Sequence, residues 1–62
     1  MYEVHARDNT WWSTLVEKFD TKEAGLRQLS LANYVKATST NGEELYVNTR
    51  AITRVVIREV PE

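Results

Sequence analysis

The side chains that most often carry out catalysis are few in this chain. His5 is the only histidine and cysteine is absent, so a thiolate nucleophile and a multi-histidine metal site are both excluded within one chain. Glu43 and Glu44 are adjacent, but on a strand they point to opposite faces and do not work together as acid and base. There is no Gly-x-Ser-x-Gly motif and no glycine-rich phosphate loop. We therefore expect a protein that is not an enzyme and that has no metal site and no cofactor.

Basic residues recur at a regular spacing near the C-terminus. Arg50, Arg54 and Arg58 are four residues apart, which keeps side chains on one face of a strand. With Lys36 from another strand and a tryptophan nearby, they would form a basic, aromatic surface suited to single-stranded nucleic acid. In the alternative interpretation, the arginines pair with glutamates across strands. The net charge of −1 favours this alternative, so nucleic acid is the less favoured partner.

The adjacent residues Trp11 and Trp12 are the clearest indication of a binding surface. On a strand their indoles point to opposite faces, and a chain this short can hardly cover both. One indole is then exposed or covered by a partner, and tryptophan is enriched among the residues that dominate interface energies. If the segment is helical, both indoles pack in the core. We assign Trp11, Trp12 and Tyr46 as candidate residues for binding another protein.

Size and composition narrow the remaining choices. The 62 residues predict one small domain, residues 1–62, and such a chain buries only about 60% of the surface that its unfolded form exposes. Without disulfides, self-association would add stability, so a homo-oligomer is one expected state. The first residues do not resemble a signal peptide, and no apolar run reaches the roughly 20 residues of a membrane-spanning helix. We therefore expect a cytoplasmic protein with no membrane partner.

The N-terminal half predicts a strand, an ambiguous segment and a helix. Tyr2–Arg7 alternates apolar and polar residues, as a half-buried strand does. Trp11–Phe19 has apolar residues at helical spacing, but its residue types and the preceding turn favour a strand. Thr21 should cap a helix over Lys22–Leu31, in which Gly25 indicates close packing against the sheet. The apolar side of this helix would carry Ala24, Leu26, Leu29 and Leu31.

The C-terminal half predicts a β-hairpin. Asn41-Gly42 between the runs Tyr34–Thr40 and Glu43–Val47 is typical of a two-residue type I′ turn. This turn places Thr38 opposite Leu45 and Lys36 opposite Val47. One face would then carry Tyr34, Lys36, Thr38, Leu45 and Val47, and the other would carry Val35, Ala37 and Tyr46.

A last strand is expected over Ile52–Val60, after a tight turn. Leu45–Ile57 resembles the strand, short turn and strand that close many small β-barrels, including the Sm-like RNA-binding proteins. The resemblance covers about a fifth of the chain. The rest departs from the Sm pattern, because the N-terminal helix and the glycine of the first motif are missing and a helix interrupts the strands. We therefore transfer no binding residues from that family.

Together these features predict an α+β protein with a small antiparallel sheet of four to five strands and one helix packed on it, in the order ββαβββ. A helical Trp11–Phe19 would give βααβββ instead. The expected function is a non-enzymatic protein-interaction module, a small regulator or inhibitor that binds through an exposed tryptophan and a sheet edge. The alternative is a small nucleic-acid-binding protein.

Overall fold

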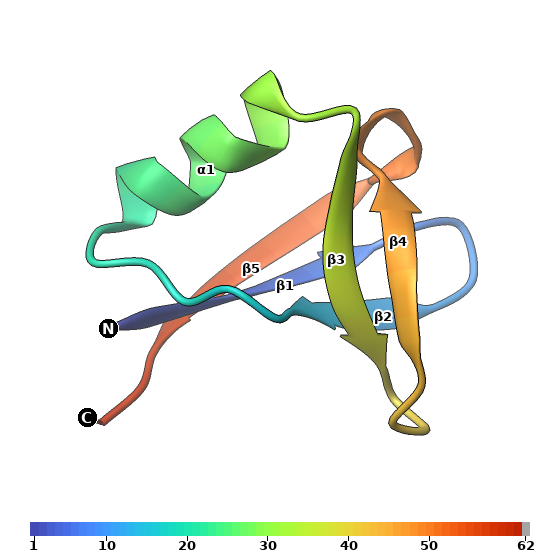
Figure 1. Ribbon diagram of the computed structural model, residues 1–62, viewed down its shortest axis with the longest axis horizontal. Coiled ribbons are helices and arrows are strands. Elements are labelled where there is room, and N and C mark those ends of the chain that lie inside the picture. Colours follow the sequence, from blue (N-terminus) through green and yellow to red (C-terminus); the bar gives the residue numbers. More distant parts are fainter. Residues whose placement is uncertain (62) are drawn as a thin grey trace.

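The computed structural model describes residues 1–61 and shows an antiparallel sheet of five strands with one α-helix packed on it (Figure 1). This is the α+β class that the sequence predicts. The elements, in chain order, are β1 (Tyr2–Arg7), β2 (Trp12–Leu15), α1 (Lys22–Leu31), β3 (Tyr34–Ser39), β4 (Glu44–Asn48), the 3₁₀ helix η1 (Thr49–Ala51) and β5 (Arg54–Glu59). In the sheet the strands lie in the order β4-β3-β2-β1-β5, so the last strand returns to pair with the first.

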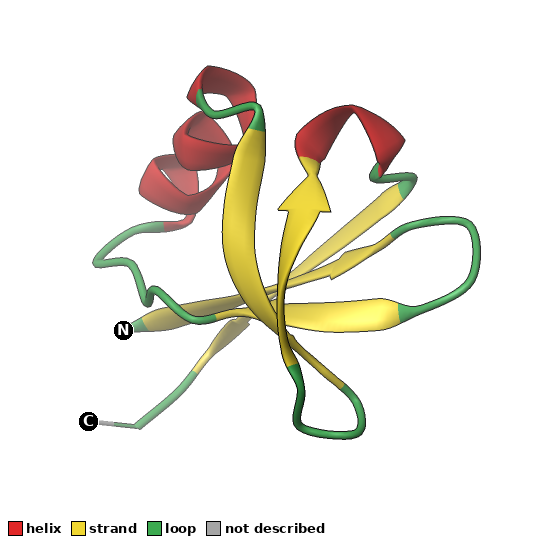
Figure 2. Cartoon of the chain, turned by 45° about the vertical axis from the view of Figure 1, so that its right-hand side comes forward, coloured by secondary structure: helices red, strands yellow, loops and turns green. Residues whose placement is uncertain are grey.

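The sheet is strongly curved. Strands β3 and β4 cross β1 and β5 at a steep angle, and η1 leads the chain from the end of β4 into β5 (Figure 2). Helix α1 packs against β1 and covers one end of the concave face (Figure 1). Helix α1 does not cover the other end of this face, and the candidate site described below lies there.

The concave face carries the core. Along β1 and β3 its buried side chains alternate with more exposed side chains that point to the convex face, as the pleat of a sheet requires. The buried apolar residues are Val4, Ala6, Leu15, Phe19, Val35, Ala37 and Val47. Most of them are small, so the core depends on close approach between the helix and the sheet.

Helix α1 spans the predicted residues and starts at the predicted cap. The hydroxyl of Thr21 accepts a hydrogen bond from the backbone N–H of Ala24 at 3.1 Å. Its predicted apolar side is wrong in part, because Leu26 and Leu31 are exposed. The helix is turned so that Gly25 faces the sheet.

Gly25 confirms the predicted close packing of helix and sheet. A Cβ atom at this position would lie 2.8 Å from Cγ2 of Val4 and 3.4 Å from the ring of Phe19. Val4 is fully buried in the middle of β1. Only glycine allows the helix to come this near without displacing Val4.

The ambiguous segment Trp11–Phe19 is a strand only over its first part. β2 covers Trp12–Leu15, and the chain then leaves the sheet before returning as a single bridge between Phe19 and Tyr2. The two backbone hydrogen bonds of this bridge measure 2.7 and 2.9 Å. The return places the ring of Phe19 in the core beneath Gly25.

The predicted register of the hairpin is wrong by one residue. Lys36 pairs with Tyr46 and Thr38 with Glu44, so three residues and not two form the loop. Gly42 has a φ of 88°, while no other described residue has positive φ, so Asn41 does not take the conformation that a type I′ turn requires. The N–H of Gly42 bonds to the carbonyl of Ser39 at 3.0 Å, as in a type I turn followed by a left-handed glycine.

This change of register corrects the predicted faces. Leu45 and Val47 share the concave face with Val35 and Ala37, whereas Tyr46 lies on the convex face beside Lys36. A shift of one residue exchanges the faces of a whole strand. The observed register therefore brings the apolar residues of both strands to the core.

Strand β5 starts two residues later than predicted. The N–H of Thr53 donates to the carbonyl of Arg7 at 2.8 Å, and its hydroxyl donates to the same oxygen at 3.2 Å. These bonds join the residue that precedes β5 to the last residue of β1, and the ladder with β1 starts at Arg54. Side chains alternate between the two faces along β5, with Arg54, Val56 and Arg58 on the convex face.

Candidate protein-binding site

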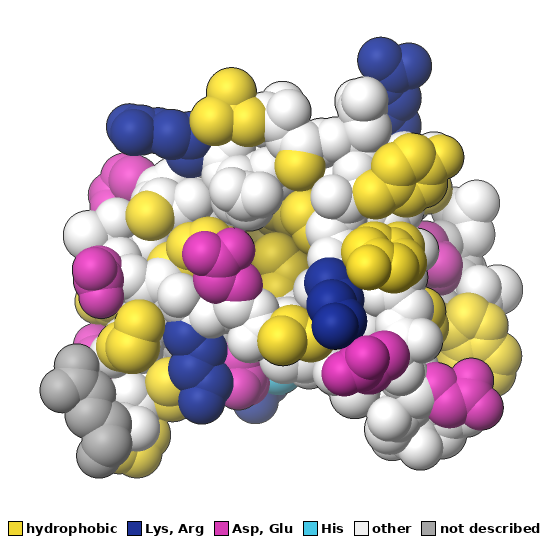
Figure 3. Space-filling view, in the orientation of Figure 1, with side chains coloured by type: hydrophobic (Ala, Val, Ile, Leu, Met, Phe, Trp, Pro, Cys, Tyr) yellow, Lys and Arg dark blue, Asp and Glu magenta, His cyan; other side chains and the backbone are white. Residues whose placement is uncertain are grey.

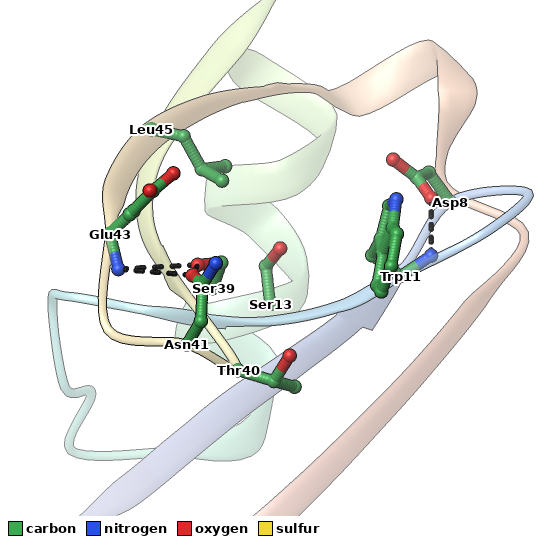
Figure 4. Close-up of a pocket in the computed structure, with 8 residues that line it drawn as sticks. All are labelled: Asp8, Trp11, Ser13, Ser39, Thr40, Asn41, Glu43 and Leu45. Carbon is green, nitrogen blue, oxygen red and sulfur yellow. Dashed lines mark hydrogen bonds between the residues drawn. The ribbon is translucent and has the colours of Figure 1, made fainter.

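A groove at the open end of the concave face runs between the β1–β2 loop and the tip of the β3–β4 hairpin (Figure 4). We call it the Trp11 groove. Its volume is about 290 Å³, and its lining residues are Asp8, Trp11, Ser13, Ser39, Thr40, Asn41, Glu43 and Leu45. Trp11 and Asp8 form one wall, and residues of the hairpin tip form the other, with Ser13 between them. The indole of Trp11 is thus presented to solvent beside a defined hollow.

The wall that carries Trp11 is held by Asp8. One carboxylate oxygen of Asp8 accepts hydrogen bonds from the backbone N–H groups of Thr10 and Trp11, both at 2.8 Å. The backbone N–H of Asp8 donates to the carbonyl of Trp11 at 3.2 Å. Trp11 is 66% exposed, yet its backbone is bonded on both sides. The exposed indole therefore stands on a fixed loop.

The opposite wall is fixed by the polar residues of the hairpin. The backbone N–H of Glu43 donates to Oγ of Ser39 at 3.2 Å and to Oδ1 of Asn41 at 3.4 Å (Figure 4). Ser39 Oγ also donates to Asn41 Oδ1, and the N–H of Ser39 bonds to the carbonyl of Glu43 at 2.8 Å. Both walls of the Trp11 groove are therefore held by local hydrogen bonds.

The groove is acidic. Hydrogen bonds from the backbone N–H groups of Thr10 and Trp11 lower the pKa of Asp8 below its usual value, so this carboxylate is ionised at neutral pH. Glu43 contributes a second carboxylate from the other wall, and none of the described lining residues is basic. A group with a lowered pKa is a poor general acid or base near neutral pH. The arrangement suits a cationic ligand that also contacts an aromatic ring.

The lowered pKa of Asp8 predicts a pH dependence of stability. Because the folded pKa lies below the unfolded value of about 4, the contribution of Asp8 is complete above that pH and is lost as pH falls through the folded pKa. We expect the melting temperature of the native protein to exceed that of Asp8→Asn near neutral pH, and the difference to vanish in acid. Melting curves between pH 7 and pH 2.5 measure it. The exposed Glu17→Gln is the control, and an offset for Asp8→Asn that is constant with pH would contradict the assignment.

Trp12 lies on the opposite face of the sheet, as the strand interpretation predicts. It is half-buried on the convex face, across from Arg7 on β1. Together with His5, Val56 and Arg58 it lines a second hollow of about 280 Å³. Of the two tryptophans, Trp11 is therefore the more exposed one.

His5 lies beside Trp12, and both of its ring nitrogens are close to oxygen atoms of neighbouring side chains. Its Nδ1 is 2.9 Å from the hydroxyl of Thr14, and its Nε2 is 2.7 Å from a carboxylate oxygen of Glu3. Among residues 1–61, no group of three His, Cys, Asp or Glu side chains is placed to hold a metal ion.

The four basic residues predicted to share a surface are separated. Arg54 and Arg58 lie together on β5, but Arg50 lies in η1, because Asn48 Oδ1 accepts its N–H at 3.0 Å and the chain turns there. Lys36 lies on β3, with β2 and β1 between it and β5, and its Nζ is 3.5 Å from a carboxylate oxygen of Glu44. The predicted row of three arginines is thus wrong.

Arg7 on β1 belongs to the same basic surface as Arg54 and Arg58, which the sequence analysis did not predict. It pairs directly with Arg54 across the β1–β5 ladder, and Arg58 pairs with Glu3. Within the described residues no ion pair joins Arg7, Arg54 or Arg58 to a carboxylate. The convex face along β5 therefore carries three arginines, and none of them forms an ion pair with a carboxylate of the described residues.

Tyr46 is not brought to the Trp11 groove. It is 70% exposed on the convex face of β4, whereas its neighbour Leu45 lines the groove from the concave face. Figure 3 shows hydrophobic side chains at the surface over β3 and β4, beside basic and acidic ones, and the exposed tyrosines there are Tyr34 and Tyr46. The three predicted protein-binding residues thus lie on three different parts of the surface.

Comparison with known proteins finds no matching family model, no matching curated protein and no matching solved structure. Within the described part of the chain, the single α-helix is too short and too polar to cross a bilayer.

Proposed function

We propose that this chain is a non-enzymatic protein-interaction module, a small cytoplasmic regulator or inhibitor, that binds another protein through Trp11 and a sheet edge. The observation that carries the proposal is the exposed indole of Trp11 on a loop whose backbone is bonded on both sides. A loop whose backbone is already held by hydrogen bonds loses little conformational entropy on binding. Tryptophan in such a position is typical of the residues that dominate interfaces.

The chemistry of the Trp11 groove selects the ligand. Asp8 and Glu43 bring two carboxylates to a hollow that Trp11 lines, and none of the described residues that line it is basic. A lysine or arginine side chain fits this environment, because it can lie against the indole and form charge-assisted hydrogen bonds with a carboxylate. The proposed ligand is a basic, extended segment of another protein.

The test is a selection of random linear peptides displayed on phage against the immobilised native chain, with Trp11→Ala as the counter-selection. We expect peptides enriched in lysine and arginine that bind the native chain and fail to bind Trp11→Ala. A selection that yields no peptide sensitive to Trp11→Ala would refute the proposal.

A second candidate function is binding of single-stranded nucleic acid on the convex face. It is favoured by Arg7, Arg54 and Arg58, which form no ion pair within the described residues and lie near the half-buried Trp12. It is the weaker candidate, since Lys36 and Arg50 lie elsewhere and the net charge is −1.

This second function predicts binding of a single-stranded oligonucleotide that weakens steeply with salt and is lost in the Arg54→Ala, Arg58→Ala double variant. Fluorescence anisotropy of a labelled oligonucleotide at several salt concentrations measures it. The exposed Arg27→Ala on α1 is the matched control. Equal affinity of the native chain and the double variant would remove this candidate.

A further inference from the structure

Strand β5 forms one edge of the sheet, and the backbone groups on its outer side have no partner strand among the described residues. The N–H of Val60 donates to the carbonyl of Met1 at 2.8 Å, which makes these two residues a hydrogen-bonded pair of the β1–β5 ladder. Such pairs alternate along an antiparallel ladder, so Arg58, Val56 and Arg54 also bond to β1. The N–H and C=O groups of Val55, Ile57 and Glu59 therefore point away from the sheet.

Both faces of β5 are incompletely covered. Val55 on the concave face is 36% exposed, and Val56 on the convex face is 37% exposed. No glycine or proline interrupts the strand between Arg54 and Glu59. An edge of this kind is a template for a further strand unless charge protects it. On the convex face that charge is of one sign, from Arg54 and Arg58.

A second copy of the chain does not suit this edge. Two copies of β5 that pair antiparallel about a two-fold axis must align residues of the same face. Two registers overlap most of the strand. The register centred on Val56 sets Arg54 of each copy opposite Arg58 of the other, and the register centred on Ile57 sets Arg58 diagonally across from Arg54 and Arg58 of the other copy. Like charges directly opposite each other destabilise a strand pair. The like-charged pair of Arg7 and Arg54 on β1 and β5 adds to this repulsion.

We infer that the free edge of β5 accepts an extended acidic strand from another protein, paired antiparallel, with acidic residues opposite Arg54 and Arg58. These two positions form non-hydrogen-bonded pairs with the added strand, in which side chains lie closest. The residues between them pair with Ile57 and Val55 and cover their exposed apolar surface. The strand therefore has the pattern acidic, apolar, any residue, apolar, acidic. This inference rests on the proposed function only in that the chain binds other proteins.

The test uses a seven-residue peptide with glutamate at its second and sixth positions, valine at its third and fifth, and threonine elsewhere, capped at both ends. Amide hydrogen exchange of the ¹⁵N-labelled chain is recorded with and without the peptide at millimolar concentration. We expect exchange at Val55, Ile57 and Glu59 to slow about tenfold or more. A peptide with both valines N-methylated keeps the charges but loses the backbone donors, and it should have no effect.

Charge reversal tests the recognition. The Arg54→Glu, Arg58→Glu double variant should bind the glutamate peptide about tenfold less tightly and should instead bind a peptide with lysines in place of the glutamates. Arg27→Glu, an exposed arginine on α1, is the matched control and should leave both affinities unchanged. Trp11→Ala should also leave edge binding unchanged, so failure here is distinguishable from failure at the Trp11 groove.

Three outcomes would overturn the inference. One is unchanged exchange at Val55, Ile57 and Glu59 with the glutamate peptide present. Another is binding of a single-stranded oligonucleotide, but not the peptide, that depends on Arg54 and Arg58. The third is protection of the same amides in the free chain together with a mass that rises with concentration, which would make a second copy the occupant.

Discussion

Replacement of Gly25 by valine is expected to lower the free energy of unfolding by about 3 kcal/mol, a large part of the roughly 3–9 kcal/mol typical of a chain this long. The added Cβ would lie 2.8 Å from Cγ2 of Val4, which is fully buried and, being β-branched, has little freedom to move aside. Thermal unfolding followed by circular dichroism measures the loss as a fall in melting temperature of about 12–24 °C.

Alanine at the same position separates packing from helix propensity. In a solvent-exposed helix Gly→Ala stabilises by about 1 kcal/mol, so a net loss in Gly25→Ala isolates the clash with Val4. Val4→Ala removes that methyl group, and the double variant should therefore lose less than the sum of the two single changes. Additive losses, or a stabilised Gly25→Ala, would contradict the observed distance between α1 and β1.

The Trp11→Ala variant should lose about 2 kcal/mol or more of binding free energy for a peptide selected on the native chain, a fall in affinity of about thirtyfold. Its free energy of unfolding should change by no more than about 0.5 kcal/mol, because the indole is 66% exposed and the loop is held by backbone bonds to Asp8 that remain. Isothermal titration calorimetry gives the affinity, and thermal unfolding gives the stability.

Tyr34→Ala is the matched control for this loss. Tyr34 is also a large exposed aromatic residue, but it lies on β3 and does not line the Trp11 groove. Its replacement should leave the affinity of the selected peptide unchanged. Equal losses of peptide affinity in Trp11→Ala and Tyr34→Ala would indicate that the peptide binds exposed aromatic residues non-specifically. This result would contradict specific binding in the Trp11 groove.

The sequence predicts those features of the fold that depend on neighbouring residues. Thr21 predicted the helix start, and Gly25 predicted the close approach of helix and sheet, because a cap and a missing Cβ act on their immediate surroundings. The hairpin was predicted but not its register. Hydrogen bonds among Ser39, Asn41 and Glu43 stabilise a three-residue loop, and a preference of the Asn-Gly pair alone does not reveal them.

The candidate site was predicted only in part. Trp11 was identified by its residue type, but its partners Asp8 and Glu43 come from two loops that the sheet brings together. Asp8 belongs to an obvious turn, and its hydrogen bonds to Thr10 and Trp11 are typical of aspartate in such turns. That pattern is a sequence signal from which the loop could have been predicted. The contribution of Glu43 depends on the register of the β3–β4 hairpin, which the sequence analysis predicts wrongly.

The arginines show why spacing alone misleads. A four-residue interval places side chains on one face only if the strand is continuous, and η1 interrupts it between Arg50 and Arg54. Instead, Arg7 lies opposite Arg54, because the first and last strands pair. Periodicity within one segment does not reveal pairing between strands so far apart in the sequence. Long-range pairing therefore decides which charges share a surface.

The measurement that tests the central claim most directly is a ¹H–¹⁵N spectrum of the two indole Nε1–H groups during titration with a selected basic peptide. Trp11 and Trp12 lie on opposite faces of the sheet, so their signals report separately on the two surfaces. We predict a saturable shift of the Trp11 indole signal while that of Trp12 stays in place. A bound peptide that leaves the Trp11 signal unchanged, or that shifts only Trp12, would contradict the account.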